Sequence, residues 1–105
     1  MKLYHGTSLE NAKSIMKTGL KTTMYNGKFY SVPMTNSLKE AKRYALSHPY
    51  KQIKNPVVIA VEISKSLILG KMQTKKEIIH YYTAFIPASM IIKMIKLNLQ
   101  GGNKK

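Results

Sequence analysis

The chain has 105 residues, no cysteine, and 18 Lys plus Arg against 4 acidic residues, which gives a formal net charge of +14. This length fits one compact domain with a small core, and a hydrophobic content of 44% is ordinary for a folded protein. The absence of cysteine excludes disulfides and thiolate nucleophiles, and the apolar runs are far shorter than the roughly 20 residues of a membrane-spanning helix.

The N-terminal part predicts a short strand at 2–4 followed by a helix. Thr7-Ser8-Leu9-Glu10 matches a capping box, in which Thr7 caps the helix and Glu10 reaches back to a free amide. Apolar residues then recur at helical spacing, and Gly19 stands where a left-handed C-terminal cap is expected. The early polar residues do not match a secretion signal, so we expect a cytoplasmic protein.

A turn and a second helix follow. Asn26-Gly27 predicts a turn, and Phe29–Val32 predicts a short strand that Pro33 stops. A second capping box, Ser37-Leu38-Lys39-Glu40, opens a helix that Pro49 closes. The acidic residues of both capping boxes are therefore expected to stabilise helix ends.

Strands dominate the second half of the chain. After a basic loop over 50–56, the β-branched run 56–63 predicts a buried strand, and 67–70 ends a short connection. A strand is expected over 75–82, with Glu77 at its entrance. The last apolar stretch, 90–99, predicts a strand with an irregular start.

These elements describe one α+β domain over residues 1–99, with a small split β-sheet core and two early helices. Residues 100–105 have nothing to bury and are expected to form a mobile basic tail.

The segment Tyr4-His5-Gly6-Thr7-Ser8 stands out because it joins a strand to a capped helix. A glycine at such a junction lets a ligand approach the backbone, and a helix N-terminus presents free amides. An ordinary strand-end histidine and turn glycine would give the same pattern. The chain has no phosphate loop, no dinucleotide glycine motif and no metal-ligand spacing among its histidines, so no metal is expected.

Two segments resemble motifs of the ADP-ribosyltransferase superfamily. Tyr4-His5-Gly6-Thr7, followed by a helix that ends in Ile15-Met16-Lys17-Thr18-Gly19-Leu20, is similar to the family's H-G-[ST] strand, helix and I-x-x-x-G-L exit. Gly27-Lys28-Phe29-Tyr30-Ser31, with Ala41 and Tyr44 downstream, resembles the tyrosine motif of the poly-ADP-ribose polymerase type.

A third segment, Glu77-Ile78-Ile79-His80-Tyr81, resembles the family's catalytic-glutamate strand. The three segments occur in the family's order and span about residues 3–92. The resemblance therefore implies a His-Tyr-Glu site made of His5, Tyr30 and Glu77, on an ADP-ribosyltransferase-like fold.

The resemblance also implies a role for each residue. His5 would bind a ribose hydroxyl of NAD, and the backbone of Gly6, with Thr7 close by, would hold the nicotinamide carboxamide. Tyr30 would stack on the nicotinamide ring, with Tyr44 as a second wall. The glutamate would stabilise the positive charge that develops on the ribose C1′ as nicotinamide leaves.

The implied activity is mono-ADP-ribosyl transfer from NAD to a macromolecule, either a nucleic acid or a host protein, by a monomeric toxin or phage effector. Because NAD and nucleic acids are anionic, the excess positive charge is a hint about the substrate.

Each site residue also has a structural interpretation. Tyr30 fits a strand in the core, Tyr44 fits helix packing, and Glu77 fits a surface turn. Glu62 interrupts an apolar strand and is expected to face outward or to be paired. His80 lies on the same strand as Glu77 and could line the cleft, although strand alternation places it on the opposite face.

Two other activities fit parts of the pattern, and an inactive member that only binds is a further interpretation. RNA 2′-phosphotransferases share the H-G-T opening, but they use additional arginines, and this chain has only Arg43. A non-catalytic nucleic-acid-binding module would use a basic patch interleaved with aromatic residues. The residues of that patch are Lys39, Lys42, Arg43, Lys51, Lys54, Tyr44 and Tyr50.

Overall fold

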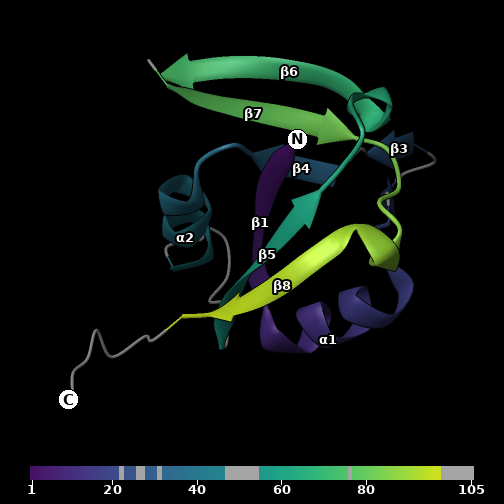
Figure 1. Ribbon diagram of the computed structural model, residues 1–105, viewed down its shortest axis with the longest axis vertical. Helices are drawn as coiled ribbons and strands as arrows, with labels where there is room; N and C mark the ends of the chain where they lie inside the picture. Colours follow the sequence, from purple (N-terminus) through teal and green to yellow (C-terminus); the bar gives the residue numbers. More distant parts are fainter. Residues whose placement is uncertain (22, 26–27, 31, 47–54, 76, 98–105) are drawn as a thin grey trace.

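The computed structural model describes most of the chain (Figure 1). The described residues are 1–21, 23–25, 28–30, 32–46, 55–75 and 77–97. The predicted turn at Asn26-Gly27, the helix stop at Pro49, most of the basic loop and the basic tail lie outside them.

The described part is an α+β fold built on a six-stranded antiparallel sheet with the order β6-β7-β4-β1-β5-β8. The strands are β1 Lys2–Ser8, β4 Val32–Thr35, β5 Pro56–Glu62, β6 Ile68–Lys75, β7 Ile78–Thr83 and β8 Ile91–Lys96. The remaining elements are α1 Leu9–Thr18, α2 Leu38–Leu46, the two-stranded ribbon of β2 Thr23–Tyr25 and β3 Lys28–Tyr30, and the 3-10 turns Lys65–Leu67 and Ala88–Met90. No helix among the described residues has the length and apolar character needed to cross a bilayer.

The two helices pack on opposite faces of the sheet. The Cα of Gly6 faces α2, where an added Cβ would meet the backbone of Ala41. Leu3 and Val57, which point to the other face, cluster with Ala12 of α1. Because neighbouring strand residues alternate between faces, β1 and β5 are covered on both sides. This explains why β5 is buried over six of its seven residues.

The sheet is split between β1 and β4. Strand β1 pairs with β5 along its whole length, but with β4 only at Tyr4 and Thr35. Strand β4 pairs instead with β7 over residues 32–35. The result is two three-stranded halves, β6-β7-β4 and β1-β5-β8, that meet at one residue pair.

Several predicted boundaries are confirmed. Gly19 ends α1 with a φ of 89°, and its amide donates to the carbonyl of Ile15 at 2.7 Å. The predicted buried strand is β5, and the last strand is β8, preceded by an irregular 3-10 turn. Glu62 faces outward and is paired, since its Oε2 lies 2.6 Å from the N-terminal amine of Met1.

The cap of α1 differs from the prediction. Ser8, not Thr7, is the capping residue, and its hydroxyl accepts a hydrogen bond from the amide of Asn11 at 3.2 Å. The reason is that β1 continues to Ser8, so Thr7 is part of the strand and is buried. Glu10 lies exposed in the first turn of α1, where a negative charge favours the helix dipole.

Strand β6 differs from the prediction, which ends a connection at 67–70 and begins the next strand at 75, whereas β6 covers Ile68–Lys75 and β7 begins at Ile78. Its sequence contains Gly70, and its register against β7 shifts near each end. It is also an edge strand, with Leu69 and Met72 well exposed. A strand held mainly by backbone pairing with its neighbour carries little of the apolar alternation that marks a strand in sequence.

Candidate functional site

His5 lies where the sheet splits. Its Nδ1 is 2.8 Å from the carbonyl oxygen of Pro33 on β4. A carbonyl can only accept a hydrogen bond, so Nδ1 carries the hydrogen, and in the neutral ring Nε2 is left as an acceptor. Burial lowers the pKa of His5, and the hydrogen bond to Pro33 opposes that shift in part. His5 is therefore a neutral histidine of fixed tautomer at neutral pH.

Pro33 does not stop a strand, contrary to the prediction. It lies inside β4 and pairs with Tyr82 of β7. In an antiparallel strand the N–H and C=O of one residue point the same way, and the Pro33 carbonyl points toward β1. The missing N–H therefore faces the split, where no ladder hydrogen bond is lost.

A cavity of about 140 Å³ lies between the split and α2, and we call it the α2 cavity. An apolar cavity of roughly 150 Å³ is known to take up one benzene ring, so this cavity has the size for a single aromatic ring. Its lining includes Tyr4, His5, Met34, Glu40, Tyr44 and His80.

A larger cavity of about 310 Å³, the α1 cavity, lies on the other side of His5. His5 and Pro33 line both cavities, so the two spaces adjoin at the histidine. The α1 cavity has a more polar lining, which includes Thr7, Asn11, Ser14, Thr18 and Lys21.

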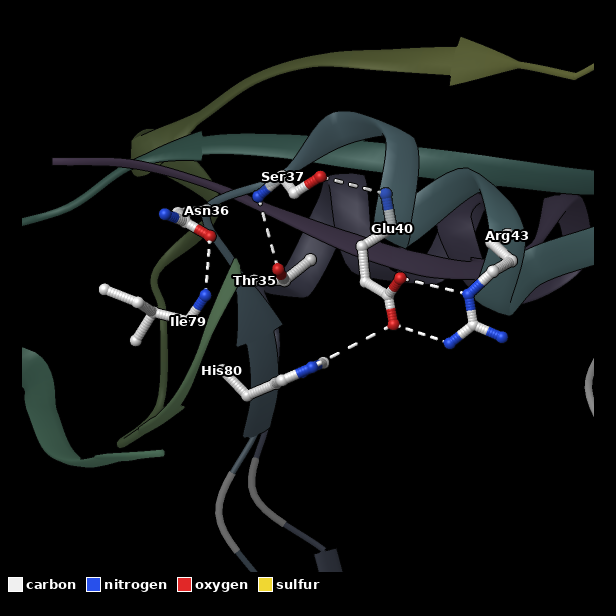
Figure 2. Close-up of polar contacts among 7 residues, drawn as sticks. All are labelled: Thr35, Asn36, Ser37, Glu40, Arg43, Ile79 and His80. Atoms are coloured by element: carbon white, nitrogen blue, oxygen red, sulfur yellow. Dashed lines mark hydrogen bonds and ion pairs between the residues drawn. The ribbon is translucent and has the colours of Figure 1, made fainter. Parts of the chain in front are cut away.

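Glu40 is the functional candidate that sequence reasoning missed, and it lies in the α2 cavity beside His80 (Figure 2). The Oε1 of Glu40 accepts from Arg43 Nε at 3.0 Å, and its Oε2 accepts from Arg43 Nη2 at 2.6 Å. The same Oε2 lies 3.9 Å from His80 Nε2. The hydrogen bonds to Glu40 raise the pKa of Arg43.

The predicted capping box at α2 is therefore only half confirmed. Ser37 Oγ accepts from the amide of Glu40 at 3.1 Å, as a cap does. The carboxylate of Glu40 turns to Arg43, while the amide of Ser37 donates to Thr35 Oγ1 at 3.2 Å. A signal was available in the sequence, because Glu40 and Tyr44 are four residues apart and share a helix face. The place of His80 depends on its pairing with Thr35 and has no local signal.

Besides His5, three of the predicted binding residues lie at the cavities. Gly6 and Tyr44 line the α2 cavity, and Thr7 lines the α1 cavity. Gly6 also has a packing role, because an added Cβ would lie 2.7 Å from the carbonyl oxygen of Ala41.

Glu77 and Tyr30 are placed differently. Glu77 is exposed in the turn before β7, and it lines neither of the two cavities. Its backbone carbonyl accepts from Asn36 Nδ2 at 3.1 Å. Tyr30 ends β3 and pairs with Thr23, but its side chain lies outside what the structure describes.

Comparisons with protein-family models and with curated proteins find no match to this chain. Within the described residues, no group of three or more His, Asp or Glu side chains is arranged to hold a metal ion.

Proposed function

We propose that this protein is an NAD-dependent mono-ADP-ribosyltransferase that cleaves the bond between nicotinamide and ribose. The observation that carries the proposal is the position of His5, a half-buried neutral histidine between a ring-sized cavity and a larger polar one. The resemblance of three sequence segments to the family supports the same activity.

NAD has two ends of different size and character, and the two cavities differ in the same way. We place the nicotinamide ring in the α2 cavity, beside Gly6, and the ADP part in the α1 cavity. There, Asn11, Ser14 and Lys21 offer hydrogen-bond donors and a positive charge to the phosphates. The ribose between them would then lie at His5, whose Nε2 accepts a hydrogen bond from a ribose hydroxyl.

In the reaction, the bond between C1′ and the ring nitrogen breaks, and its electron pair goes to the ring, which leaves as neutral nicotinamide. Positive charge builds on C1′ until a nucleophile of the acceptor attacks that carbon and loses its proton. The resemblance assigns the stabilisation of the developing charge to Glu77, which lies at the entrance of β7 and outside the lining of the two cavities. Asn36 fixes the turn that carries it.

The test uses NAD labelled in its adenylate part, with the purified protein and a cell lysate that contains both protein and nucleic acid. We expect nicotinamide release and a labelled macromolecule. Glu77→Gln should lower the rate by about 10²- to 10³-fold, the usual cost of removing one electrostatic stabiliser. Glu10→Gln, an equal charge change on the exposed side of α1, should leave the rate unchanged.

Absence of both nicotinamide release and labelled product with the wild-type chain would overturn the proposal. The protein would instead be a basic binding module if it binds nucleic acid with an affinity that falls steeply with salt and that Glu77→Gln does not change.

RNA 2′-phosphotransfer gains no support from the site. The single arginine of the chain, Arg43, holds both carboxylate oxygens of Glu40 and does not line either cavity.

A further inference from the structure

The α2 cavity contains a carboxylate that the proposed reaction does not use. Only 12% of the Glu40 side chain is exposed, and it lines the cavity together with Tyr4 and Tyr44. A carboxylate in such a place has to be compensated by charge and hydrogen bonds. Arg43 supplies both, and 63% of its side chain is exposed.

The two charges of this pair act on the cavity unequally. Glu40 lines the cavity, whereas Arg43 lies outside the lining and in contact with solvent. Water screens the guanidinium charge more strongly than it screens the carboxylate, because the effective dielectric constant is higher at the exposed side. The electrostatic potential that the pair creates inside the cavity is therefore negative.

The rest of the lining adds no permanent positive charge, since His80, 3.9 Å from Glu40 Oε2, is a cation only when it is protonated. None of the described residues that line the α2 cavity is lysine or arginine, although the chain carries a net charge of +14. His5 is neutral, and the aromatic rings of Tyr4 and Tyr44 attract cations through their faces.

We propose that the α2 cavity binds a flat aromatic ring that carries a positive charge, with Glu40 as its counterion. The inference rests on the proposed function for the identity of the natural ring, since the pyridinium of NAD is an aromatic cation. When the bond to ribose breaks, the ring becomes neutral and loses its attraction to Glu40. Glu40 thus favours the bound substrate over released nicotinamide, and it acts on binding more than on the chemical step.

The test compares two probes of the same shape, 1-methylnicotinamide, which is a cation, and 3-methylbenzamide, its neutral isostere. Affinities of the full chain for each are measured by calorimetry and by NMR shifts of the His5 and His80 rings. The wild-type chain should bind the cation at least about tenfold more tightly, a difference of about 1.4 kcal/mol. Glu40→Gln should reduce this preference to about twofold or less, and Glu10→Gln should retain it.

The wild-type comparison needs no substitution, so it stands even if Glu40→Gln folds poorly. Equal affinities for the two probes, binding of neither, or a preference that survives in folded Glu40→Gln would each overturn the inference.

Kinetics with NAD separate this inference from the proposed function. Glu40→Gln should raise KM several-fold without lowering kcat, because the attraction to Glu40 weakens as the ring loses its charge, whereas Glu77→Gln should lower kcat. A cation preference in a chain that releases no nicotinamide would remove the transferase proposal and leave the ring site. NAD cleavage without any preference for the cationic probe would support the transferase proposal and overturn the inference about Glu40.

Discussion

At the scale of single residues, β1 carries two neighbours with different constraints. Gly6 lies under α2, where the helix backbone leaves no room for a side chain. His5 points into the split of the sheet, where a backbone carbonyl fixes its tautomer and burial lowers its pKa. Two adjacent residues of β1 thus have separate roles, since Gly6 allows α2 to pack closely and His5 stays neutral at the split.

Gly6→Ala should destabilise the protein. The new Cβ would lie 2.7 Å from the carbonyl oxygen of Ala41 and 3.1 Å from the Cβ of Ala45, so α2 has to move away from the sheet. We expect a loss of about 1–3 kcal/mol in the free energy of unfolding, the usual cost of overpacking, measured by urea denaturation. Gly70→Ala is the matched control, because its Cβ would meet only Tyr82 Cδ2, at 3.9 Å, and the change should stay within about 1 kcal/mol. Equal effects of the two substitutions would contradict the tight packing at Gly6.

Stability should fall in acid partly through His5. Burial lowers its pKa in the folded state, so the unfolded chain binds the proton more readily, starting near the ordinary value of 6.5. Because stability rises with pH wherever the unfolded state holds more protons, it should drop as the pH falls from about 6.5 toward the lower folded pKa. His5→Gln should flatten this part of the curve of unfolding free energy against pH. An unchanged slope would show that His5 is not the responsible group.

At the scale of elements, the side chain of Asn36, which directly follows β4, holds the start of β7 in place. Asn36 donates through Nδ2 to the carbonyl of Glu77, and its Oδ1 accepts from the amide of Ile79 at 2.9 Å. The amide of Asn36 also donates to the carbonyl of Ile79, at 3.2 Å. These contacts tie the entrance of β7 to the start of α2, and so they set the position of Glu77 relative to the rest of the sheet.

Asn36→Ala should loosen this turn. It removes two hydrogen bonds, each of which contributes about 0.5–1.5 kcal/mol, and it leaves the amide of Ile79 without its acceptor. Hydrogen exchange at Ile79 should become faster, while exchange in β5 follows only the global stability. Asn36→Asp keeps the acceptor for Ile79 and loses the donor to Glu77, so it should retain most of the protection. Equally fast exchange in both variants would show that the Oδ1 contact does not hold the turn.

At the scale of the whole molecule, the dominant feature is the net charge of +14, which repels itself in any compact state. Among the described residues, ion pairs join Arg43 to Glu40, the N-terminal amine to Glu62, and His80 to Glu40 when the histidine is protonated. Their carboxylates are two of only four acidic residues in the chain, so the repulsion is largely uncompensated.

Moderate salt should therefore stabilise the protein. The Debye length shortens from about 30 Å at 0.01 M to about 8 Å at 0.15 M, which screens repulsion between distant lysines. We expect the thermal unfolding temperature to rise over this range in sodium chloride. A rise that needs sulfate or phosphate and is absent with chloride would indicate binding of a particular anion instead.

The sequence by itself determined the features that depend on near neighbours. The helix stop at Gly19, the buried run of β5 and the α+β character follow from caps and periodicity within a few residues. The candidate histidine was found in the same way, at the junction of a strand and a helix. The roles of Tyr30 and Glu77 remain predictions of the sequence.

Tertiary structure decided the features that depend on residues far apart in the chain. His5 and Pro33 are 28 positions apart, and only their contact shows that the sheet splits there and that a proline fits within β4. Glu40 changed from a capping residue to the carboxylate of a cavity because Arg43 and His80 lie beside it. Local patterns fix which elements form, whereas strand register and the gaps between elements are set by long-range packing, and the cavities of this protein lie in those gaps.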